Sequence, residues 1–219
     1  MTELNTLELF KESLPSILSG LNVTLQLSII SLSIASLLGL IFGLMMITQN
    51  KFFRFVATVY VDLIRGTPLI VQAFFIYFGL PSAFHFKLSA YLAGIIALSL
   101  NSGAYMAEIF RAGILAVDKG QMEAARSLGL SYYKSMTKVI LPQAIRKMIP
   151  AIINQFIIAI KDTSLLSVIG IRELTQSGEI IIASNYRAFE IWGMVAVFYL
   201  ALIMLISTFS RRIERCLKL

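Results

Sequence analysis

The feature that most constrains this chain is a stretch without charged side chains that runs from Ser13 to Asn50. A helix of about twenty apolar residues crosses the hydrocarbon core of a bilayer, so this stretch is long enough for a complete crossing. Hydrophobic residues make up 58% of the 219-residue chain, and its mean hydropathy is +0.81. These values exclude an ordinary soluble domain. The chain is therefore expected to be an all-α integral membrane protein.

Five apolar runs are expected to span the membrane within a single transmembrane domain, residues 1–219. Their approximate bounds are 21–47, 56–80, 88–110, 148–170 and 191–210. The segment 111–147 is too polar to span and is expected to form a loop. Before the first run, Met1 to Leu18 has the pattern of an amphipathic surface helix that Pro15 ends or bends. Gly39 and Gly43 in the first run would let a second helix approach closely.

Lys and Arg are distributed unequally over the loops. The chain has 19 Lys and Arg against 12 Asp and Glu. Counted over alternate loops, 13 of the basic residues share a side with the 111–147 loop and the C-terminal tail, and four lie on the other side: Lys11, Lys87, Arg172 and Arg187. The positive-inside rule then predicts the N-terminus outside, and the loop and the C-terminus in the cytoplasm. The positive excess thus sets orientation and does not indicate nucleic-acid binding.

The polar insert from Met122 to Pro150 has the pattern helix, break, helix, break. Glu123 to Leu128 favour a helix, and Gly129 suits the left-handed residue that ends one. Ser131 can cap a second helical segment. Pro142 is expected to force the residue before it out of the helical region.

Several residues of the insert follow a known spacing: Glu123, Ala124, Ala125, Gly129, Leu141 and Pro142, with Val139 where isoleucine is usual. This spacing resembles the EAA loop of bacterial ABC importer permeases. Three further stretches, RGTPLIVQ from Arg65, SGAYMAEIFRAGI from Ser102 and KDTSLLSVIG from Lys161, resemble the subfamily that imports polar amino acids. The resemblance covers nearly the whole chain.

The resemblance implies a type I ABC importer permease fold in the bacterial plasma (inner) membrane. It implies that the six EAA-loop residues couple the permease to an ATPase. The implied partners are two ABC ATPase subunits, a second permease copy or a similar permease, and an external solute-binding protein. ATP and Mg would be bound by the ATPase, and this chain would bind no cofactor. The alternative for the insert is a merely structural interfacial helix.

Polar side chains inside apolar spans are costly unless they face protein or water, so they indicate a functional interior. Three spans carry such groups: Arg65 and Thr67; Asn101, Tyr105 and Glu108; Lys161, Asp162 and Ser164. The middle three share one helix face. A rise of 1.5 Å per residue places most of these groups roughly 14 to 20 Å along their spans, with Glu108 nearer the cytoplasmic end. They are therefore predicted to meet at one depth and to bind the substrate.

A zwitterionic amino acid needs a cation for its carboxylate, and an anion or carbonyl oxygens for its ammonium group. We assign these roles to Arg65 and Asp162. Asn101 and Ser164 would supply neutral hydrogen bonds, and Glu108 is a candidate gate or a partner for a basic side chain. In the alternative, four charged groups pair with one another and only hold the helices together: Arg65, Lys161, Asp162 and Glu108.

The sequence contains no G-x-x-x-x-G-K-[ST] or H-E-x-x-H motif and no nucleophile constellation, so the chain is not expected to be an enzyme. The chain has one histidine, His85, and one cysteine, Cys216. A metal site is not expected from a lone histidine, and a lone cysteine cannot form an internal disulfide. The alternative function is a stand-alone secondary amino-acid transporter that uses the buried charges as an ion relay. Five spans without two visible halves argue against it. Co-purification with an ATPase favours the importer, whereas ion-driven uptake by this chain alone favours the alternative.

Overall fold

The structure is a computed structural model that describes residues 6–216, and every regular element in that range is helical. The predicted surface helix begins outside this range, at residues 1–5, and the side chain of Cys216 also lies outside the described part. The elements are α1 (Thr6–Ile47), α2 (Lys51–Arg65), α3 (Leu69–Phe74), η1 (Phe75–Gly79), α4 (Leu80–Phe84), α5 (Ala90–Leu115), α6 (Lys119–Ser127), α7 (Tyr132–Ser135), η2 (Met136–Ile140), α8 (Leu141–Asp162), η3 (Thr163–Ile169), α9 (Leu174–Asn185) and α10 (Ala188–Cys216).

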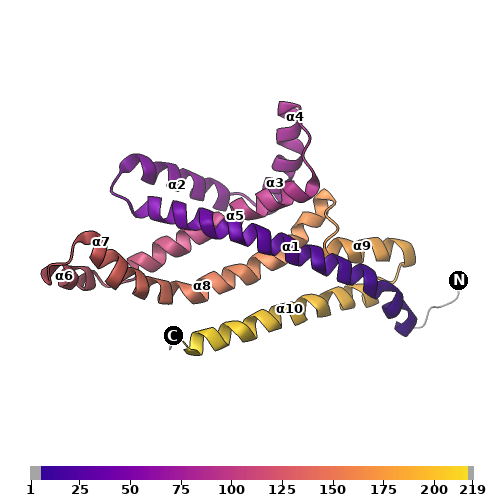
Figure 1. The fold of residues 1–219 in the computed structure, drawn as a ribbon. Coiled ribbons are helices and arrows are strands. Elements are labelled where there is room, and N and C mark those ends of the chain that lie inside the picture. The colour runs from indigo at the N-terminus through magenta and orange to yellow at the C-terminus, as the bar shows by residue number, and fades with distance from the viewer. Residues whose placement is uncertain (1–5, 217–219) are drawn as a thin grey trace.

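Among the described residues, four helical segments are long and apolar enough to cross a membrane: Thr6–Ile47, Ala90–Leu115, Tyr132–Ile169 and Ala188–Arg212. A fifth is reached if the bent pair Lys51–Arg65 and Leu69–Phe84 is counted as one span. The start of α1 and α9 lie at one end of the bundle, and α6 and α7 lie at the opposite end (Figure 1).

Helix α1 continues through Pro15, so of the two predicted outcomes, a helix end or a bend, the end is wrong. A proline inside a helix removes one backbone hydrogen bond and costs about 3 kcal/mol in an unsupported helix. Here Leu9 and Ile17, on either side of the proline, are buried at 2% and 0% exposure. Ile17 packs with Leu174 in a hydrophobic cluster that also includes Val195. Tertiary packing on both sides of Pro15 holds the helix together.

The contact between α1 and α5 is the largest between any two elements. Small buried side chains follow one face of α1 at spacings of three or four: Thr24, Ser28, Ser31, Ala35, Gly39 and Gly43. A Cβ on Gly39 would overlap the Cβ of Met106, and one on Gly43 would lie 2.8 Å from the carbonyl oxygen of Ala107. The prediction that these glycines admit a second helix is confirmed, and that helix is α5.

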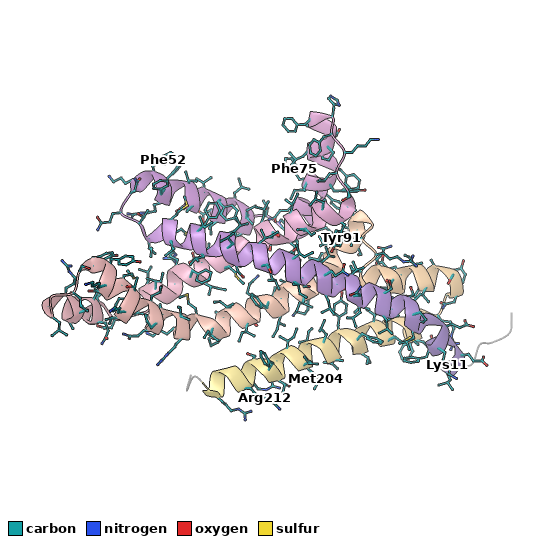
Figure 2. The ribbon with its side chains drawn as sticks, in the orientation of Figure 1. Lys11, Phe52, Phe75, Tyr91, Met204 and Arg212 are labelled. Atoms are coloured by element: carbon teal, nitrogen blue, oxygen red, sulfur yellow. The ribbon has the colours of Figure 1, made fainter. Side chains whose placement is uncertain are left out.

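The second predicted span, 56–80, is not straight. The chain bends by 102° between α2 and the segment Leu69–Phe84. Gly66 to Pro68 separate the two parts, because Pro68 cannot donate a backbone hydrogen bond and disfavours the helical region for Thr67. Beyond the bend, α3, η1 and α4 form an arm that projects from the bundle (Figure 1). Phe75 lies on this arm (Figure 2) and is 60% exposed.

Pro142 does not end a helix, so the prediction for the residue before it is also wrong: Leu141 has helical φ and ψ of −60° and −42°. The five residues of η2 form a π turn in which the N–H of Leu141 bonds to the carbonyl of Met136. The wider turn shifts the hydrogen-bond register just before the proline, where an N–H is missing. A second π turn, η1, precedes Leu80 and Pro81 in the same way, with the N–H of Leu80 on Phe75.

The segment between the fourth and fifth predicted spans is largely helical. It contains α9, whose N-cap is Glu173. The left-handed residue Tyr186, with φ of 59°, ends α9 and leads into α10. Helix α10 crosses the lower part of Figure 2 with Met204 on it and Arg212 near its end.

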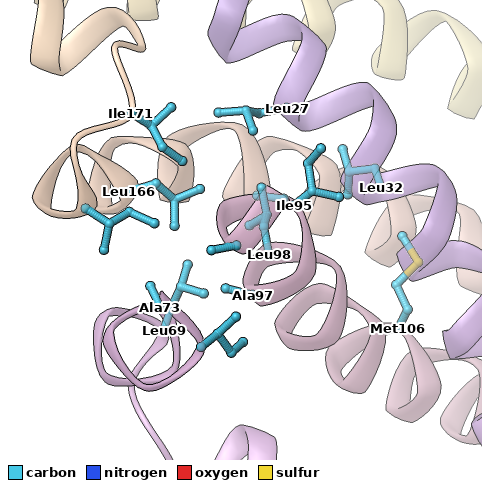
Figure 3. Close-up of a cluster of buried hydrophobic side chains, with 14 residues drawn as sticks. Leu27, Leu32, Leu69, Ala73, Ile95, Ala97, Leu98, Met106, Leu166 and Ile171 are labelled. Carbon is cyan, nitrogen blue, oxygen red and sulfur yellow. The ribbon is translucent and has the colours of Figure 1, made fainter. Parts of the chain in front are cut away.

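The main hydrophobic core joins α1, α3, α5 and η3 (Figure 3). Leu27 and Leu32 come from α1, Leu69 and Ala73 from α3, Ile95, Ala97 and Leu98 from α5, and Leu166 from η3. All of them are at most 8% exposed. This core fixes the positions of α3, α5 and η3 relative to one another.

Gly39→Ala is expected to destabilise the protein by about 1–3 kcal/mol, because the added methyl group overlaps Met106 and α1 must move away from α5. Thermal unfolding in detergent micelles measures the effect. The matched control is Gly193→Ala, since a Cβ at that position meets no heavy atom within 4 Å. Equal midpoints for the two variants would contradict this account of the α1–α5 contact.

Candidate functional site

The centre of the candidate site is a hydrogen-bond network beside the break between α2 and α3. The Nε2 atom of Gln72 has two protons to share among three acceptors: the carbonyl of Ile64 at 2.7 Å, the carbonyl of Thr67 at 3.0 Å and the Oγ1 atom of Thr67 at 2.9 Å. Its Oε1 atom accepts a hydrogen bond from Nδ2 of Asn101 at 3.1 Å. Asn101 lies on α5 and is 5% exposed. One glutamine therefore bonds to backbone carbonyls on the α2 side of the break and, through Asn101, ties the break to α5.

The charged part of the site lies one to two turns further along α5. The Arg65 guanidinium is 4.0 Å from Oε2 of Glu108 and lies over the ring of Tyr105, 5.2 Å from its centroid. Glu108 is also held by Arg111, whose Nε donates to Oε2 at 3.0 Å. Tyr105 and Glu108 lie on one face of α5, and Arg65 at the end of α2 contacts both of them.

Lys161, Asp162 and Ser164 lie where α8 gives way to η3. Ser164 donates through Oγ to the carbonyl of Lys161 at 2.6 Å. Among the residues that the structure describes, no hydrogen bond or ion pair joins these three to the groups on α2, α3 and α5. They are connected to the other predicted residues through the shared hydrophobic core, in which Leu166 of η3 meets α3 and α5.

Two residues of this site were not predicted from the sequence. Gln72 is 8% exposed and sits in the RGTPLIVQ stretch, where an uncharged amide among apolar residues was the available signal. Arg111 lies three residues after Glu108 on the same helix, and that spacing favours an ion pair. The alternative prediction was that four charged groups pair with one another: Arg65, Glu108, Lys161 and Asp162. Of these pairings, the structure shows the one between Arg65 and Glu108.

The predicted coupling residues lie at the end of the molecule away from α9 (Figure 1). Glu123, Ala124 and Ala125 are on α6, with Ala125 buried at 4% exposure and the other two exposed. Gly129 has φ of +81°, so its predicted left-handed conformation is confirmed. Leu141 and Pro142 are the first two residues of α8.

The second helical segment of the loop begins as predicted. Ser131 caps α7 by accepting the N–H of Lys134 at 3.4 Å. At the end of α6 and the start of α7, the tip of the loop exposes large side chains: Leu128 at 83%, Tyr132 at 62% and Tyr133 at 75%. Clustered exposed apolar side chains of this kind are typical of surfaces that contact another protein.

Direct contacts connect the loop to α5 and α8. Nε2 of Gln143 on α8 donates to Oε1 of Gln121 on α6 at 3.1 Å, and Nζ of Lys147 donates to the carbonyl of Ala116 at 2.6 Å. A hydrophobic cluster underlies both bonds, with buried members Ile114, Val117, Ile140, Ala144 and Met148. The loop, the end of α5 and the start of α8 therefore form one packed unit.

A metal site is not built by this arrangement. Within the described residues, no group of three or more His, Cys, Asp or Glu side chains is placed to hold an ion.

Four or five membrane-crossing helical elements, an internal polar face beside a broken helix and an exposed helical loop define a membrane transport subunit. The sequence matches the family of binding-protein-dependent transport system inner membrane components over residues 35–218, and the chain belongs to this family. It is a multi-pass permease subunit of an ABC importer, a transport component and not an enzyme.

Individual relatives agree with this assignment. The chain is 44% identical over 208 residues to the glutamine transport system permease protein GlnP of Escherichia coli (strain K12), covering 94% of this chain and 95% of that protein. It is 38% identical over 205 residues to the arginine transport system permease protein ArtQ of Bacillus subtilis (strain 168), covering 94% of each.

Two solved structures share the fold. The crystal structure of an amino acid ABC transporter with histidines matches with a TM-score of 0.92 and 42% identity, covering 98% of this chain and 99% of that one. The inward-facing MetNI methionine ABC transporter matches with a TM-score of 0.78 at 22% identity, covering 92% of this chain and 95% of that one. At 22% identity, the second match shows the fold alone.

The Gln72–Asn101 hydrogen bond is expected to contribute about 1 kcal/mol of coupling energy, because each alanine substitution leaves a buried amide without its partner. A double-mutant cycle of Gln72→Ala and Asn101→Ala, followed by denaturant unfolding in detergent micelles, measures this coupling. The control cycle combines Gln72→Ala with Ser99→Ala, whose buried hydroxyl has no hydrogen-bond partner. Additive effects in the first cycle would show that the bond does not tie the break to α5.

Proposed function

We propose that this chain is the permease of an ATP-driven importer that carries a polar amino acid of the glutamine or arginine type across the bacterial plasma membrane. The relatives named as glutamine and arginine permeases, each covered over at least 94% of its length, support this substrate class. A separate external solute-binding protein delivers the amino acid. Two ATPase subunits bind ATP and Mg, and a second permease copy or a similar permease completes the path.

The proposed topology has five spans, with α2 and the arm α3–η1–α4 together forming the second. The N-terminus is outside, and the coupling loop and the C-terminus are in the cytoplasm. The unequal distribution of Lys and Arg over alternate loops supports this orientation. The positions of α6 and α7, at the end opposite to the start of α1, fit it as well (Figure 1).

The observation that carries the coupling role is the packed unit of loop, α5 and α8. An ATPase that binds Leu128, Tyr132 and Tyr133 moves α6 and α7 with it, because these side chains form the exposed tip of the loop. The displacement passes from α6 to α8 through the Gln143 bond, and from α8 to the end of α5 through the Lys147 bond. Both helices carry predicted substrate residues, so ATP-driven motion of the ATPases reshapes the site.

In the proposed site, Arg65 binds the substrate carboxylate and Asp162 binds the ammonium group, with Asn101, Tyr105, Thr67, Lys161 and Ser164 around them. Arg65 is suited to its role because its side chain is 39% exposed and its pairing with Glu108, at 4.0 Å, is loose. Glu108 acts as the gate, since it holds Arg65 and Arg111 together toward the end of α5 nearest the coupling loop.

Uptake of radiolabelled L-glutamine and L-arginine by the assembled transporter in liposomes tests the function. Arg65→Gln and Asp162→Asn are expected to raise the KM for uptake at least tenfold while the complex still assembles, because each removes one charge-assisted bond to substrate. Arg54→Gln is the matched control, since Arg54 lies at the opposite end of α2 and bonds to the Thr48 carbonyl.

Two outcomes would contradict these proposals separately. Loss of the assembled complex for both variants would show that the charges only bind the helices together. Ion-driven uptake by the wild-type chain without ATPase subunits would overturn the importer itself.

Gly129→Asp is expected to abolish docking of the ATPase while the permease still inserts. An L-residue is strained at φ of +81°, and the new carboxylate sits in the proposed docking tip. Co-purification with the ATPase measures docking. Gly170→Asp is the matched control, because Gly170 has the same φ and, like Gly129, no atom within 4 Å of an added Cβ. Equal docking of the two variants would show that the loop is not the lever.

A further inference from the structure

A groove between α5 and α8 begins at Glu108 and continues toward the coupling loop. Its volume is about 310 Å³, and both Glu108 and Lys147 line it. Between these two charged residues the lining includes small side chains: Ala112, Gly113, Ala116 and Ala151. A volume of this size lies at the lower end of the range for small-molecule sites. The groove therefore has room for one amino acid between an acidic end and a basic end.

Close contacts set the register of the two helices along the groove. A Cβ on Gly113 would overlap the side chain of Met148, and Nζ of Lys147 lies 2.6 Å from the carbonyl oxygen of Ala116. Because Ala116 follows Gly113 whereas Lys147 precedes Met148, the helices run antiparallel here. Glu108, five residues before Gly113, therefore faces the part of α8 that follows Met148, about 7.5 Å beyond this contact.

Gln155 is a buried amide at nearly the depth of Glu108, because it lies seven residues, or about 10.5 Å, after Met148. It is 5% exposed, and within residues 6–216 its side chain makes no hydrogen bond. Gln72, by contrast, uses both ends of its buried amide in hydrogen bonds. Gln155 is on the same face of α8 as Ala151, one turn further on, and helical side chains lean toward the helix N-terminus, which here is toward the groove. Since an unpaired buried amide is costly, Gln155 indicates a partner that binds and leaves.

The free hydrogen-bonding groups at the two ends of the groove match a polar amino acid. The Lys147 ammonium has three protons and donates one to the Ala116 carbonyl, so two remain for a carboxylate. The Gln155 amide can both donate and accept, which suits the side-chain amide of glutamine and the guanidinium of arginine alike. Glu108 is already bonded to Arg111. Lys147 and Gln155 are eight residues apart, about 12 Å of rise, and two hydrogen bonds of about 2.9 Å leave roughly half of that for an extended amino acid.

We propose that this groove is a second amino-acid site, on the coupling-loop side of the Glu108 gate, in which Lys147 binds the α-carboxylate and Gln155 binds the polar end of the side chain. The inference rests on the proposed function, because it takes the imported amino acid to be of the glutamine or arginine type. Lys147 also bonds to the Ala116 carbonyl, so one side chain serves both the bound carboxylate and the connection between α8 and α5. Movement of the coupling loop therefore acts directly on the amino acid that is about to be released.

Thermal unfolding of the full-length permease without substrate tests whether Gln155 lacks a structural partner. Gln155→Leu replaces the amide with an apolar side chain of similar size, so the unfolding midpoint in detergent micelles is expected to stay the same or rise. Gln72→Leu is the matched control at a bonded glutamine and is expected to lower the midpoint by about 2–4 °C. A fall for Gln155→Leu as large as that for Gln72→Leu would overturn the proposal.

Equilibrium binding of radiolabelled L-glutamine and L-arginine tests the groove itself, with the assembled transporter in detergent and without the solute-binding protein. Arg65→Gln weakens the first site, so binding that remains in this variant is assigned to the groove. Adding Gln155→Leu is expected to weaken the remaining binding at least tenfold. Asn154→Leu is the matched control, because Asn154 is the exposed neighbour of Gln155 on α8, and it is expected to leave this binding unchanged.

The outcomes separate the groove from the proposed function. Remaining binding that Asp162→Asn abolishes and Gln155→Leu leaves intact would belong to the first site and would overturn the groove. Absence of remaining binding, in a transporter whose wild type imports either amino acid, would also overturn the groove but leave the proposed function standing. Remaining binding that Gln155→Leu weakens, in a transporter whose wild type imports neither amino acid, would instead overturn the proposed import and leave the groove standing.

Discussion

The close contact between α1 and α5 is the constraint on which the rest of the structure depends. Without a hydrophobic driving force between helices in lipid, close packing of small side chains is what brings them together. Gly39 and Gly43 let α5 lie directly on α1, and this contact uses the face of α5 that carries Met106 and Ala107. The polar face of α5 is then left for α2, α3 and their break, where Asn101 meets Gln72. The position of the candidate site thus follows from glycines on a helix that contributes no residue to it.

Helical segments in this protein continue past prolines by two physical means. At Pro15, packing of buried neighbours compensates for a lost hydrogen bond. At Pro81 and Pro142, a π turn ends two residues before the proline. The turn shifts the register of the backbone hydrogen bonds just before the residue that lacks an N–H. The second of these π turns lies at the root of the coupling loop. It lets α7 run directly into α8, so the loop is joined to a membrane helix without a flexible connection.

The features that could be predicted from the sequence are those that depend on residues close together in the chain. Apolar runs predicted helical segments long enough to cross a membrane. The left-handed conformation of Gly129 and the cap at Ser131 followed from their residue types, and the i, i+4, i+7 spacing put Asn101, Tyr105 and Glu108 on one face of α5. The continuation through Pro15, the size of the bend at Pro68 and the existence of α9 depend on contacts between distant segments. A single sequence does not encode those contacts in any short pattern, and Gln72 was missed for the same reason: its partners are 5, 8 and 29 residues away.

The polar groups of the candidate site lie at interruptions of the helices, and this limits what each can offer a substrate. The hydroxyl of Thr67 donates to the carbonyl of Leu63 at 3.0 Å, and that of Ser164 donates to the carbonyl of Lys161 at 2.6 Å. A hydroxyl has one proton to donate, so each retains only acceptor capacity. These two residues are therefore suited to the ammonium group of an amino acid and not to its carboxylate. The carboxylate is left to the cations Arg65 and Lys161, whose donors are not consumed by the breaks. In the proposed site, backbone satisfaction at the helix breaks would thus leave Thr67 and Ser164 for the ammonium group and Arg65 and Lys161 for the carboxylate.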